Sequence, residues 1–282
     1  MTGPRGPAAR VRARLTQSLP ADALAALPAG YQRLGSVLVV RLPEVLRPHY
    51  PAIGAAWQAE LGVAAVLRHA SRTEGDHRAP VVERIAGDRT ETEVVEHGVR
   101  YRFDAAAIMF AAGNQAERAR IGALVRPGES VVDLFAGIGY FALPAAVHGR
   151  ARSVVAVEAN PVAHGYLVEN ARRNGVGDRI TPILGDNRVV ELPEGTADRV
   201  ILGWLPSAVA WIPRAVTCAR PTATLHVHLV AEVRVAPATI AATVRAAVER
   251  TERPVDDAVV RRVKPYGPGR DHVVVDVRLA PD

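Results

Sequence analysis

The chain has 282 residues, of which 49% are hydrophobic, and its 35 basic and 29 acidic side chains give a formal net charge of +6. This hydrophobic fraction is sufficient for a buried core and excludes an intrinsically disordered chain. No apolar run approaches the ~20 residues of a membrane span, the first residues lack the apolar segment of a secretory signal, and one cysteine excludes a disulfide framework. We therefore expect a cytoplasmic globular protein without a membrane partner.

The positive charge is concentrated at the N-terminus. Arg5, Arg10, Arg12 and Arg14 supply +4 of it, so the chain from residue 21 onward carries only +2. Residues 1–20, rich in Arg, Ala, Pro and Gly, are predicted to form a disordered arm. A basic surplus is typical of nucleic-acid-binding proteins, but most of this one lies in the predicted arm. Lys264 is the only lysine.

Residues 21–104 are predicted to form a small α+β domain. Short runs of β-branched and other apolar residues predict strands at 36–42, 63–68, 81–87, 92–97 and 99–103, and a helix is expected at 52–60. His97-Gly98, between the last two strands, is typical of a tight hairpin turn.

Residues 105–282 alternate strands with helices, which is typical of a parallel sheet covered on both faces. Strands are predicted at 130–136, 153–159, 180–184, 198–203 and 223–230, and helices at 114–125, 140–148, from Asn160-Pro161 onward, at 207–218 and at 236–249. Two last strands, 258–266 and 271–279, are joined by Gly267-Pro268-Gly269. The pattern predicts a doubly wound α/β domain that closes with an antiparallel hairpin.

The strongest local signal is the stretch Asp133-Leu-Phe-Ala-Gly137-Ile-Gly139, in which an acid ends a strand and a glycine-rich turn leads into a helix. Glycines let the backbone approach a ligand, and a helix N-terminus presents free N–H groups. Ligands of open α/β sheets bind beyond the carboxyl ends of the strands. The residues expected at the ligand are Asp133, Phe135, Ala136, Gly137, Gly139, Glu158, Ala159, Asn160, Asp186 and Asn187.

Two cofactors fit this loop. Gly137-x-Gly139-x-x-Ala142 matches the dinucleotide fingerprint, with Glu158 at 21 residues after Gly137. S-adenosylmethionine (SAM) is favoured because Asp133 can hold its cationic amino-acid end and Asp186-Asn187, after a third strand, can contact its adenine. Glu158 would accept the ribose hydroxyls. These residues also have a purely structural interpretation. Glu158 can interact favourably with the dipole of a helix N-terminus, and Asp186-Asn187 can be an ordinary turn pair.

Motifs along nearly the whole chain, from about Leu27 to Leu279, carry a family resemblance. They are Phe103-Asp104, Met109-Phe110, Gly113-Asn114, Glu117-Arg118, VVDLFAGIGYFALP, VEANP, NGVGDRI, GDNR, ADRVILGWLPS, LHVHL and VKPYGPGRDHVVVDV. In this order they resemble the tRNA wybutosine-synthesising aminocarboxypropyltransferases, to which the archaeal and eukaryotic tRNA guanine methyltransferases are related. The resemblance implies a Rossmann-like class I methyltransferase fold and SAM as donor.

Two segments indicate the branch. The methylating branch typically has Ser-Pro-Arg before Glu117 and Asn-Leu-Pro later, whereas this chain has Gly113-Asn114 and Gly203–Ser207. The resemblance to the other branch implies attack on the γ-carbon of SAM and release of methylthioadenosine. Asn114 and Ser207 are the expected polar contacts around the γ-carbon or acceptor, although each can instead be a helix cap. Ile201 departs from the asparagine usual in that branch.

The resemblance leaves the acceptor open. In the wybutosine enzymes it is a modified guanine of tRNA. The fold also resembles the nocardicin aminocarboxypropyltransferase, which alkylates a phenol, and the azetidine-2-carboxylate synthases, which cyclise SAM itself. The nearly neutral chain beyond residue 20 favours a small-molecule acceptor or SAM alone, in small-molecule biosynthesis, with tRNA as the alternative. A SAM-dependent methyltransferase and a non-catalytic RNA-binding relative are further alternatives.

Five other side chains call for a structural interpretation. His226 and His228 alternate with apolar residues and so face one side of a strand; without an evident third ligand we expect hydrogen-bonded core or pocket histidines and no metal. Trp204 and Trp211 are expected to pack in the core or to form a wall for an aromatic acceptor. Cys218 is expected to be a small buried apolar residue.

Overall fold

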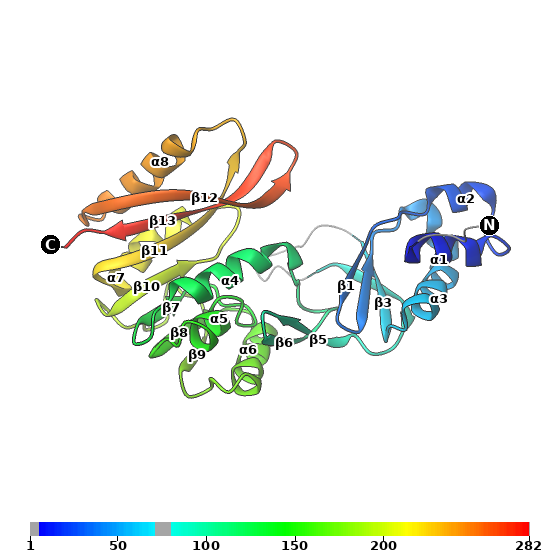
Figure 1. The fold of residues 1–282 in the computed structure, drawn as a ribbon, viewed down its shortest axis with the longest axis horizontal. Helices are drawn as coiled ribbons and strands as arrows, with labels where there is room; N and C mark the ends of the chain where they lie inside the picture. The colour runs from blue at the N-terminus through cyan, green and yellow to red at the C-terminus, as the bar shows by residue number, and fades with distance from the viewer. Residues whose placement is uncertain (1–5, 71–79, 282) are drawn as a thin grey trace. The chain divides into compact units, whose positions relative to one another are not determined.

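The structure is a computed structural model that describes residues 6–70 and 80–281. The chain forms two compact units (Figure 1). The first contains residues 1–95 and 100–110, and the second contains residues 96–99 and 111–282. Among the described residues, no helix has the length and apolar character needed to span a membrane.

The first unit is built on a four-stranded mixed sheet in the order β1-β2-β3-β4. Its strands are β1 (Tyr31–Leu34), β2 (Val37–Val40), β3 (Ala65–His69) and β4 (Val82–Gly87), and its helices are α1 (Pro7–Leu15), α2 (Ala21–Ala26), the 3-10 helix η1 (Glu44–His49) and α3 (Tyr50–Leu61). A separate hairpin joins β5 (Glu91–Glu96) to β6 (Val99–Asp104). The predicted turn is confirmed, because His97 and Gly98 have φ values of 49° and 80°.

The N-terminal residues differ from the predicted disordered arm, because Pro7–Leu15 form helix α1. Val11 and Leu15 lie one helical turn apart, and both are buried in a core cluster that includes Trp57. Arg12 donates to the Leu27 carbonyl at 2.7 Å. The prediction is therefore wrong for the helix: two apolar residues at helical spacing provide a buried face, and the arginines around them obscured it. Residues 1–5 lie outside the described residues.

The second unit contains a seven-stranded sheet in the order β12-β13-β11-β10-β7-β8-β9. The strands are β7 (Ser130–Asp133), β8 (Ser153–Glu158), β9 (Ile180–Leu184), β10 (Ala197–Leu202), β11 (Ala219–Glu232), β12 (Val255–Gly267) and β13 (Arg270–Leu279). The five strands from β11 to β9 are parallel, and β13 is antiparallel to both β11 and β12. The predicted doubly wound class I methyltransferase fold with its closing hairpin is confirmed.

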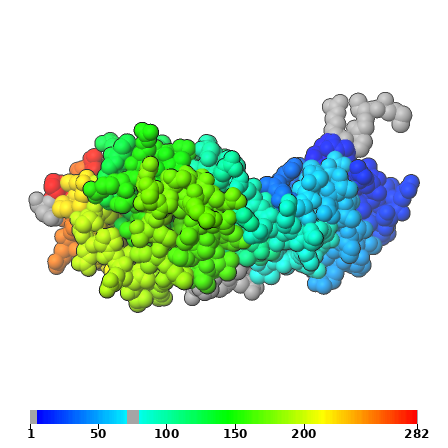
Figure 2. Space-filling view, turned by 90° about the horizontal axis from the view of Figure 1, so that it is seen from below, coloured from blue at the N-terminus to red at the C-terminus, as the bar shows by residue number. Residues whose placement is uncertain are grey.

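Helices cover both faces of this sheet (Figure 1). They are α4 (Gln115–Leu124), α5 (Ala142–Val147) and α6 (Pro161–Arg173) on one face and α7 (Ile212–Cys218) and α8 (Pro237–Glu249) on the other. Cys218, the last residue of α7, is buried in the core cluster that includes residues of α7 and α8, as predicted. Figure 2 shows the molecule from below, where the part of the second unit coloured green to yellow-green forms the surface.

Strand direction determines which residues share an edge of the sheet. The parallel strands β7, β8, β9 and β10 all end at the same edge, which we call the carboxyl edge. Helix α4 ends at Leu124, shortly before β7 begins at the opposite, amino edge. The first residues of α4 therefore lie at the carboxyl edge, together with the ends of the four strands.

Candidate active site

The loop after β7 has two positions that only glycine fits. Gly137 has a φ of 56°, and a Cβ there would lie 2.6 Å from the Tyr140 ring. Gly139 has a φ of 100°, and its Cβ would lie 2.7 Å from the Leu143 side chain. The Ala136 amide donates to the Val157 carbonyl at 2.8 Å, which fixes the loop to β8. The glycines thus bring the backbone close to the carboxyl edge without side chains in the way.

Asp133 ends β7 and is fully buried. Its Oδ1 accepts the Phe135 amide at 3.2 Å, whereas Oδ2 has no hydrogen-bond partner within the described residues. Burial, with a smaller contribution from the Glu158 charge, raises the pKa of Asp133 to about 7, although the amides of Phe135 and Ala142 favour its charged form. A buried carboxyl group with one unpartnered oxygen and a raised pKa can be stabilised in its charged form by a cationic hydrogen-bond donor.

Glu158 connects two segments of the carboxyl edge. One carboxylate oxygen accepts the Gly137 amide at 2.7 Å and the other accepts the Asn160 amide at 2.7 Å. Asn160 caps α6, because its Oδ1 accepts the Val162 amide at 2.9 Å, as its position before Pro161 predicted. Ala159 is exposed between them. A carboxylate has about four acceptor sites, so Glu158 can also accept hydroxyl groups of a ligand.

The structure separates the predicted pair Asp186 and Asn187. Asn187 is buried and donates to the Leu134 carbonyl at 2.8 Å, while its Oδ1 lacks a partner within the described part of the chain. Asp186 accepts the Arg188 amide at 2.9 Å and binds the same residue's guanidinium. Asn187 is therefore brought to the end of β7, whereas Asp186 takes the turn arrangement.

The two residues expected near the reacting carbon differ in their surroundings. Asn114 precedes α4 but makes no cap hydrogen bond, and its Oδ1 is buried without a partner within residues 6–70 and 80–281. Ser207 is exposed, and its Oγ accepts the Val209 amide at 3.4 Å, in a turn before the 3-10 helix η3 (Val209–Trp211). Asn114 thus resembles a binding group more than Ser207 does.

Aromatic rings pack beside the loop. Phe135 lies with its ring centroid 5.3 Å from that of Trp204 and 5.2 Å from that of Trp211. The two tryptophan rings are 5.9 Å apart. All three side chains are half-buried, so they combine packing with an accessible aromatic surface at the carboxyl edge.

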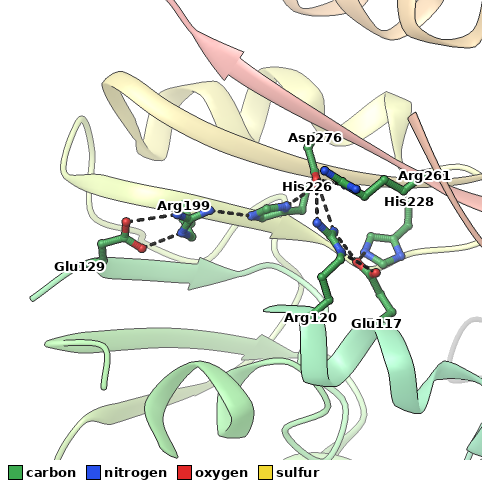
Figure 3. Close-up of polar contacts among 8 residues, drawn as sticks. All are labelled: Glu117, Arg120, Glu129, Arg199, His226, His228, Arg261 and Asp276. Atoms are coloured by element: carbon green, nitrogen blue, oxygen red, sulfur yellow. Dashed lines mark hydrogen bonds and ion pairs between the residues drawn. The ribbon is translucent and has the colours of Figure 1, made fainter. Parts of the chain in front are cut away.

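A buried polar network runs beneath α4, and Figure 3 shows its members converging on Asp276. This carboxylate accepts hydrogen bonds from Arg120 at 2.6 Å and from Arg261 at 3.2 Å, and it contacts His226 Nδ1 at 2.7 Å. Although burial opposes ionisation, the bonds from His226 and Arg120 hold the pKa of Asp276 well below its usual range. The network therefore fixes α4 to the sheet with Asp276 ionised.

The second part of the network surrounds His228. Its Nδ1 lies 2.9 Å from His272 Nε2, and its Nε2 lies 4.0 Å from Glu117 Oε1. Glu117 in turn accepts two hydrogen bonds from Arg120, at 2.7 and 2.6 Å (Figure 3). Burial, followed by the neighbouring histidines, lowers the pKa of His228 well below its ordinary value, so its ring is neutral. The prediction of hydrogen-bonded core histidines is confirmed for His226 and His228.

Sequence reasoning missed several supporting residues. Asn170, fully buried on α6, donates to the Ile138 carbonyl of the glycine loop at 3.2 Å. Its only sequence signal is its place beside Leu167 and Ala171 on the buried face of α6. Asp276 and Arg120 are 156 positions apart, and no local motif predicts that they form a pair.

Comparison with known proteins shows similarity over both units. A family model described as the TRM5/TYW2 methyltransferase domain matches residues 92–255, and one described as the TYW2 N-terminal domain matches residues 11–90. The chain is 36% identical over 271 residues to the tRNA(Phe) (4-demethylwyosine(37)-C(7)) aminocarboxypropyltransferase of Pyrococcus horikoshii, and the match covers 96% of each protein.

Solved structures agree with this assignment. TYW2 of P. horikoshii in complex with MeSAdo has a TM-score of 0.85 at 35% identity, covering 97% of this chain and 99% of that one. TYW2 of M. jannaschii in complex with AdoMet has a TM-score of 0.73 at 30% identity, covering 90% of this chain and all of the other. The chain belongs to the TYW2 family, which is related to the Trm5 methyltransferases.

Proposed function

We propose that this protein transfers the 3-amino-3-carboxypropyl group of SAM to a modified guanosine of tRNA(Phe). The observation that carries the proposal is a set of buried acceptor oxygens without partners at the carboxyl edge: Asn114 Oδ1, Asp133 Oδ2 and Asn187 Oδ1. Each costs about 1–3 kcal/mol if it stays unsatisfied. Such a set suits a ligand with several donors, and SAM has an ammonium, ribose hydroxyls and an adenine amino group.

The donor groups of SAM fit the residues present. We assign the ammonium to Asp133, whose Oδ2 is bare and whose carboxylate ionises more readily beside a cation. We assign the ribose hydroxyls to Glu158, which already ties the glycine loop to the start of α6. Asn187 is assigned to the adenosine part, and Asn114 to the amino-acid part. The TYW2 structures in complex with AdoMet and MeSAdo support SAM as the donor.

For the acceptor, the relatives support tRNA(Phe) over the small molecule that the charge distribution favoured. The small-molecule acceptor was favoured because the first arginines were predicted to form a separate disordered arm. In the structure Arg10 pairs with Glu60 at 2.5 Å, and Arg12 donates to backbone carbonyls of the first unit. The charges of Arg10 and Arg12 therefore belong to the folded first unit, so they count toward the positive charge that a polyanion such as tRNA would meet.

SAM supplies an electrophilic γ-carbon next to a sulfonium leaving group. As the acceptor carbon bonds to that γ-carbon, the bond from the γ-carbon to sulfur breaks, and its electron pair leaves with neutral methylthioadenosine. The acceptor carbon then loses a proton, which balances the charge. Because this leaving group needs no protonation, the residues of the carboxyl edge contribute orientation and exclusion of water.

The acceptor can be tested by measuring methylthioadenosine release with and without tRNA(Phe) that carries 4-demethylwyosine at position 37. We expect release only with this tRNA, and we expect tRNA binding to weaken steeply with salt through counterion release. Equal release from SAM alone would instead identify an enzyme that cyclises or hydrolyses its own donor. Release that requires a phenol or amine and ignores tRNA would restore the small-molecule acceptor.

A further inference from the structure

Lys264 differs from the other basic residues in its type and in its surroundings. It is the only lysine among 35 basic residues, so at this position alone the chain departs from its use of arginine. The side chain is half-buried near the end of β12. Burial, followed by the nearby charge of Arg118, lowers the pKa of its ammonium. Within the described residues this ammonium has neither a hydrogen bond nor an ion pair, so its charge is not compensated.

The side chain of Lys264 extends across Gly113. A Cβ built on Gly113 would lie 3.0 Å from Lys264 Cδ and 3.3 Å from its Nζ. Gly113 does not have a positive φ, so its backbone does not require glycine. The missing side chain instead provides the space that Lys264 occupies. The ammonium consequently lies beside the residue that precedes Asn114.

Strand direction places Lys264 at the carboxyl edge. Strand β12 is antiparallel to β13, and β13 is antiparallel to β11, so β12 runs in the same direction as β11 and β10. Lys264, near the end of β12, therefore lies at the same edge as Asp133 and the start of α4. Lysine carries a compact ammonium on a flexible stem, whereas the guanidinium of arginine is a wider planar group.

The amino-acid end of SAM is a zwitterion, and so it requires a cation as well as acceptors. Asp133 and Asn114 offer bare acceptor oxygens. Arg118 is the other cation nearby, but it forms two hydrogen bonds of 2.7 Å to Glu96, and its charge is compensated. We propose that the ammonium of Lys264 binds the carboxylate of the SAM amino-acid group and thereby holds the part of SAM that is transferred. This inference rests on the proposed function.

The test compares SAM with methylthioadenosine, which has the same nucleoside but lacks the aminocarboxypropyl group. In the variant Lys264→Met we expect SAM to bind roughly 10- to 100-fold more weakly, because a charge-assisted hydrogen bond is lost. Methylthioadenosine should bind within about twofold of the wild-type affinity, since its contacts are unchanged. Calorimetry gives both affinities, and circular dichroism verifies the fold. Arg270→Met is the matched control, because it removes an exposed positive charge from the same hairpin, and both affinities should stay unchanged.

Gly113→Ala offers an independent perturbation, since its methyl group would displace Lys264 without removing the charge. It should weaken SAM binding less than Lys264→Met does and leave methylthioadenosine binding unchanged. Unchanged SAM affinity in Lys264→Met would overturn the inference, and so would equal weakening of both ligands. Unchanged SAM affinity with weaker tRNA binding would overturn it in favour of a phosphate contact. A wild-type protein that fails to bind SAM would instead refute the proposed function.

Discussion

The amino and carboxyl edges of the seven-stranded sheet use the same polar residue types in opposite ways. At the amino edge, Glu129 pairs with Arg199 at 2.6 Å. Asp198 accepts the Ser130 amide at 2.7 Å and pairs with Arg220 at 2.5 Å. Glu129 and Asp198 are therefore both engaged within the protein, and they join neighbouring strands.

At the carboxyl edge, Asn114, Asp133 and Asn187 each leave a buried oxygen without a partner in the described residues. Glu158 accepts the backbone amides of Gly137 and Asn160, in the two loops that it connects. Leaving buried acceptors unsatisfied costs stability, and this cost is the reason for proposing that a ligand satisfies them. The difference between the edges separates acids that stabilise the sheet from acids that we propose bind SAM.

The largest effect on binding is expected from Asp133→Asn. Removing one partner of a buried charge pair costs about 3–5 kcal/mol, which corresponds to more than a hundredfold loss of SAM affinity. The fold should persist, because the free carboxyl group is already costly to ionise. Calorimetric titration with SAM measures the change. A folded Asp133→Asn variant that bound SAM with normal affinity would contradict the assignment of the SAM ammonium to Asp133.

Glu158→Ala should have the next largest effect. Loss of charge-assisted hydrogen bonds to the ribose hydroxyls should weaken SAM binding by about 1.5–3 kcal/mol. Methylthioadenosine carries the same ribose and should weaken by a similar factor, in contrast to its response to Lys264→Met. Unchanged affinity for both nucleosides would assign Glu158 to the loop structure alone.

The pH dependence of binding should reveal Asp133 in the wild-type protein. Its pKa of about 7 lies above the value of an exposed aspartate, so a proton must be removed before the carboxylate binds a cation. SAM affinity should therefore rise about tenfold from pH 6 to pH 8, and Asp133→Asn should abolish this rise. In the absence of SAM the folded state holds this proton more tightly than the unfolded state does. Asp133 should thus make stability fall as pH rises from about 4 to 7, which thermal melts of both proteins can measure.

The smallest effect on binding is expected at the amino edge. Asp198→Asn removes the ion pair with Arg220 and weakens the bond to the Ser130 amide, which should lower stability by about 1 kcal/mol. SAM affinity should stay within experimental error. A loss of binding comparable to that of Glu158→Ala would mean that the two edges are not functionally distinct.

Much of the second unit could be predicted from sequence, because its strands and helices follow regular hydrophobic patterns and its glycine loop has a local motif. Asp133, Gly137 and Gly139 lie where the motif placed them. The motif could not decide between Asp186 and Asn187, because the turn geometry after β9 determines which side chain points inward. The positions of the motifs in the sequence therefore predict which residues follow the strands at the carboxyl edge. Only the local backbone geometry shows which of these side chains point inward.

Other features had no adequate signal in the sequence. Helix α1 buries only Val11 and Leu15, too short an apolar pattern to recognise among arginines. The contact between Lys264 and Gly113 joins residues far apart in the chain, and only the rarity of lysine marked one of them. The relatives favour a tRNA acceptor, whereas the charge distribution along the sequence favoured a small molecule. That distribution was divided by sequence position, but folding places Arg10 and Arg12 within the first unit.

The central claim is that the carboxyl edge holds SAM so that its γ-carbon, and not its methyl group, reaches the tRNA. The most direct measurement uses two preparations of SAM, one labelled in the carboxyl carbon and one in the methyl carbon, with tRNA(Phe) that carries 4-demethylwyosine. The account predicts that the carboxyl label enters the tRNA while the methyl label leaves in methylthioadenosine. Methyl label in the tRNA, with S-adenosylhomocysteine as the product, would contradict it.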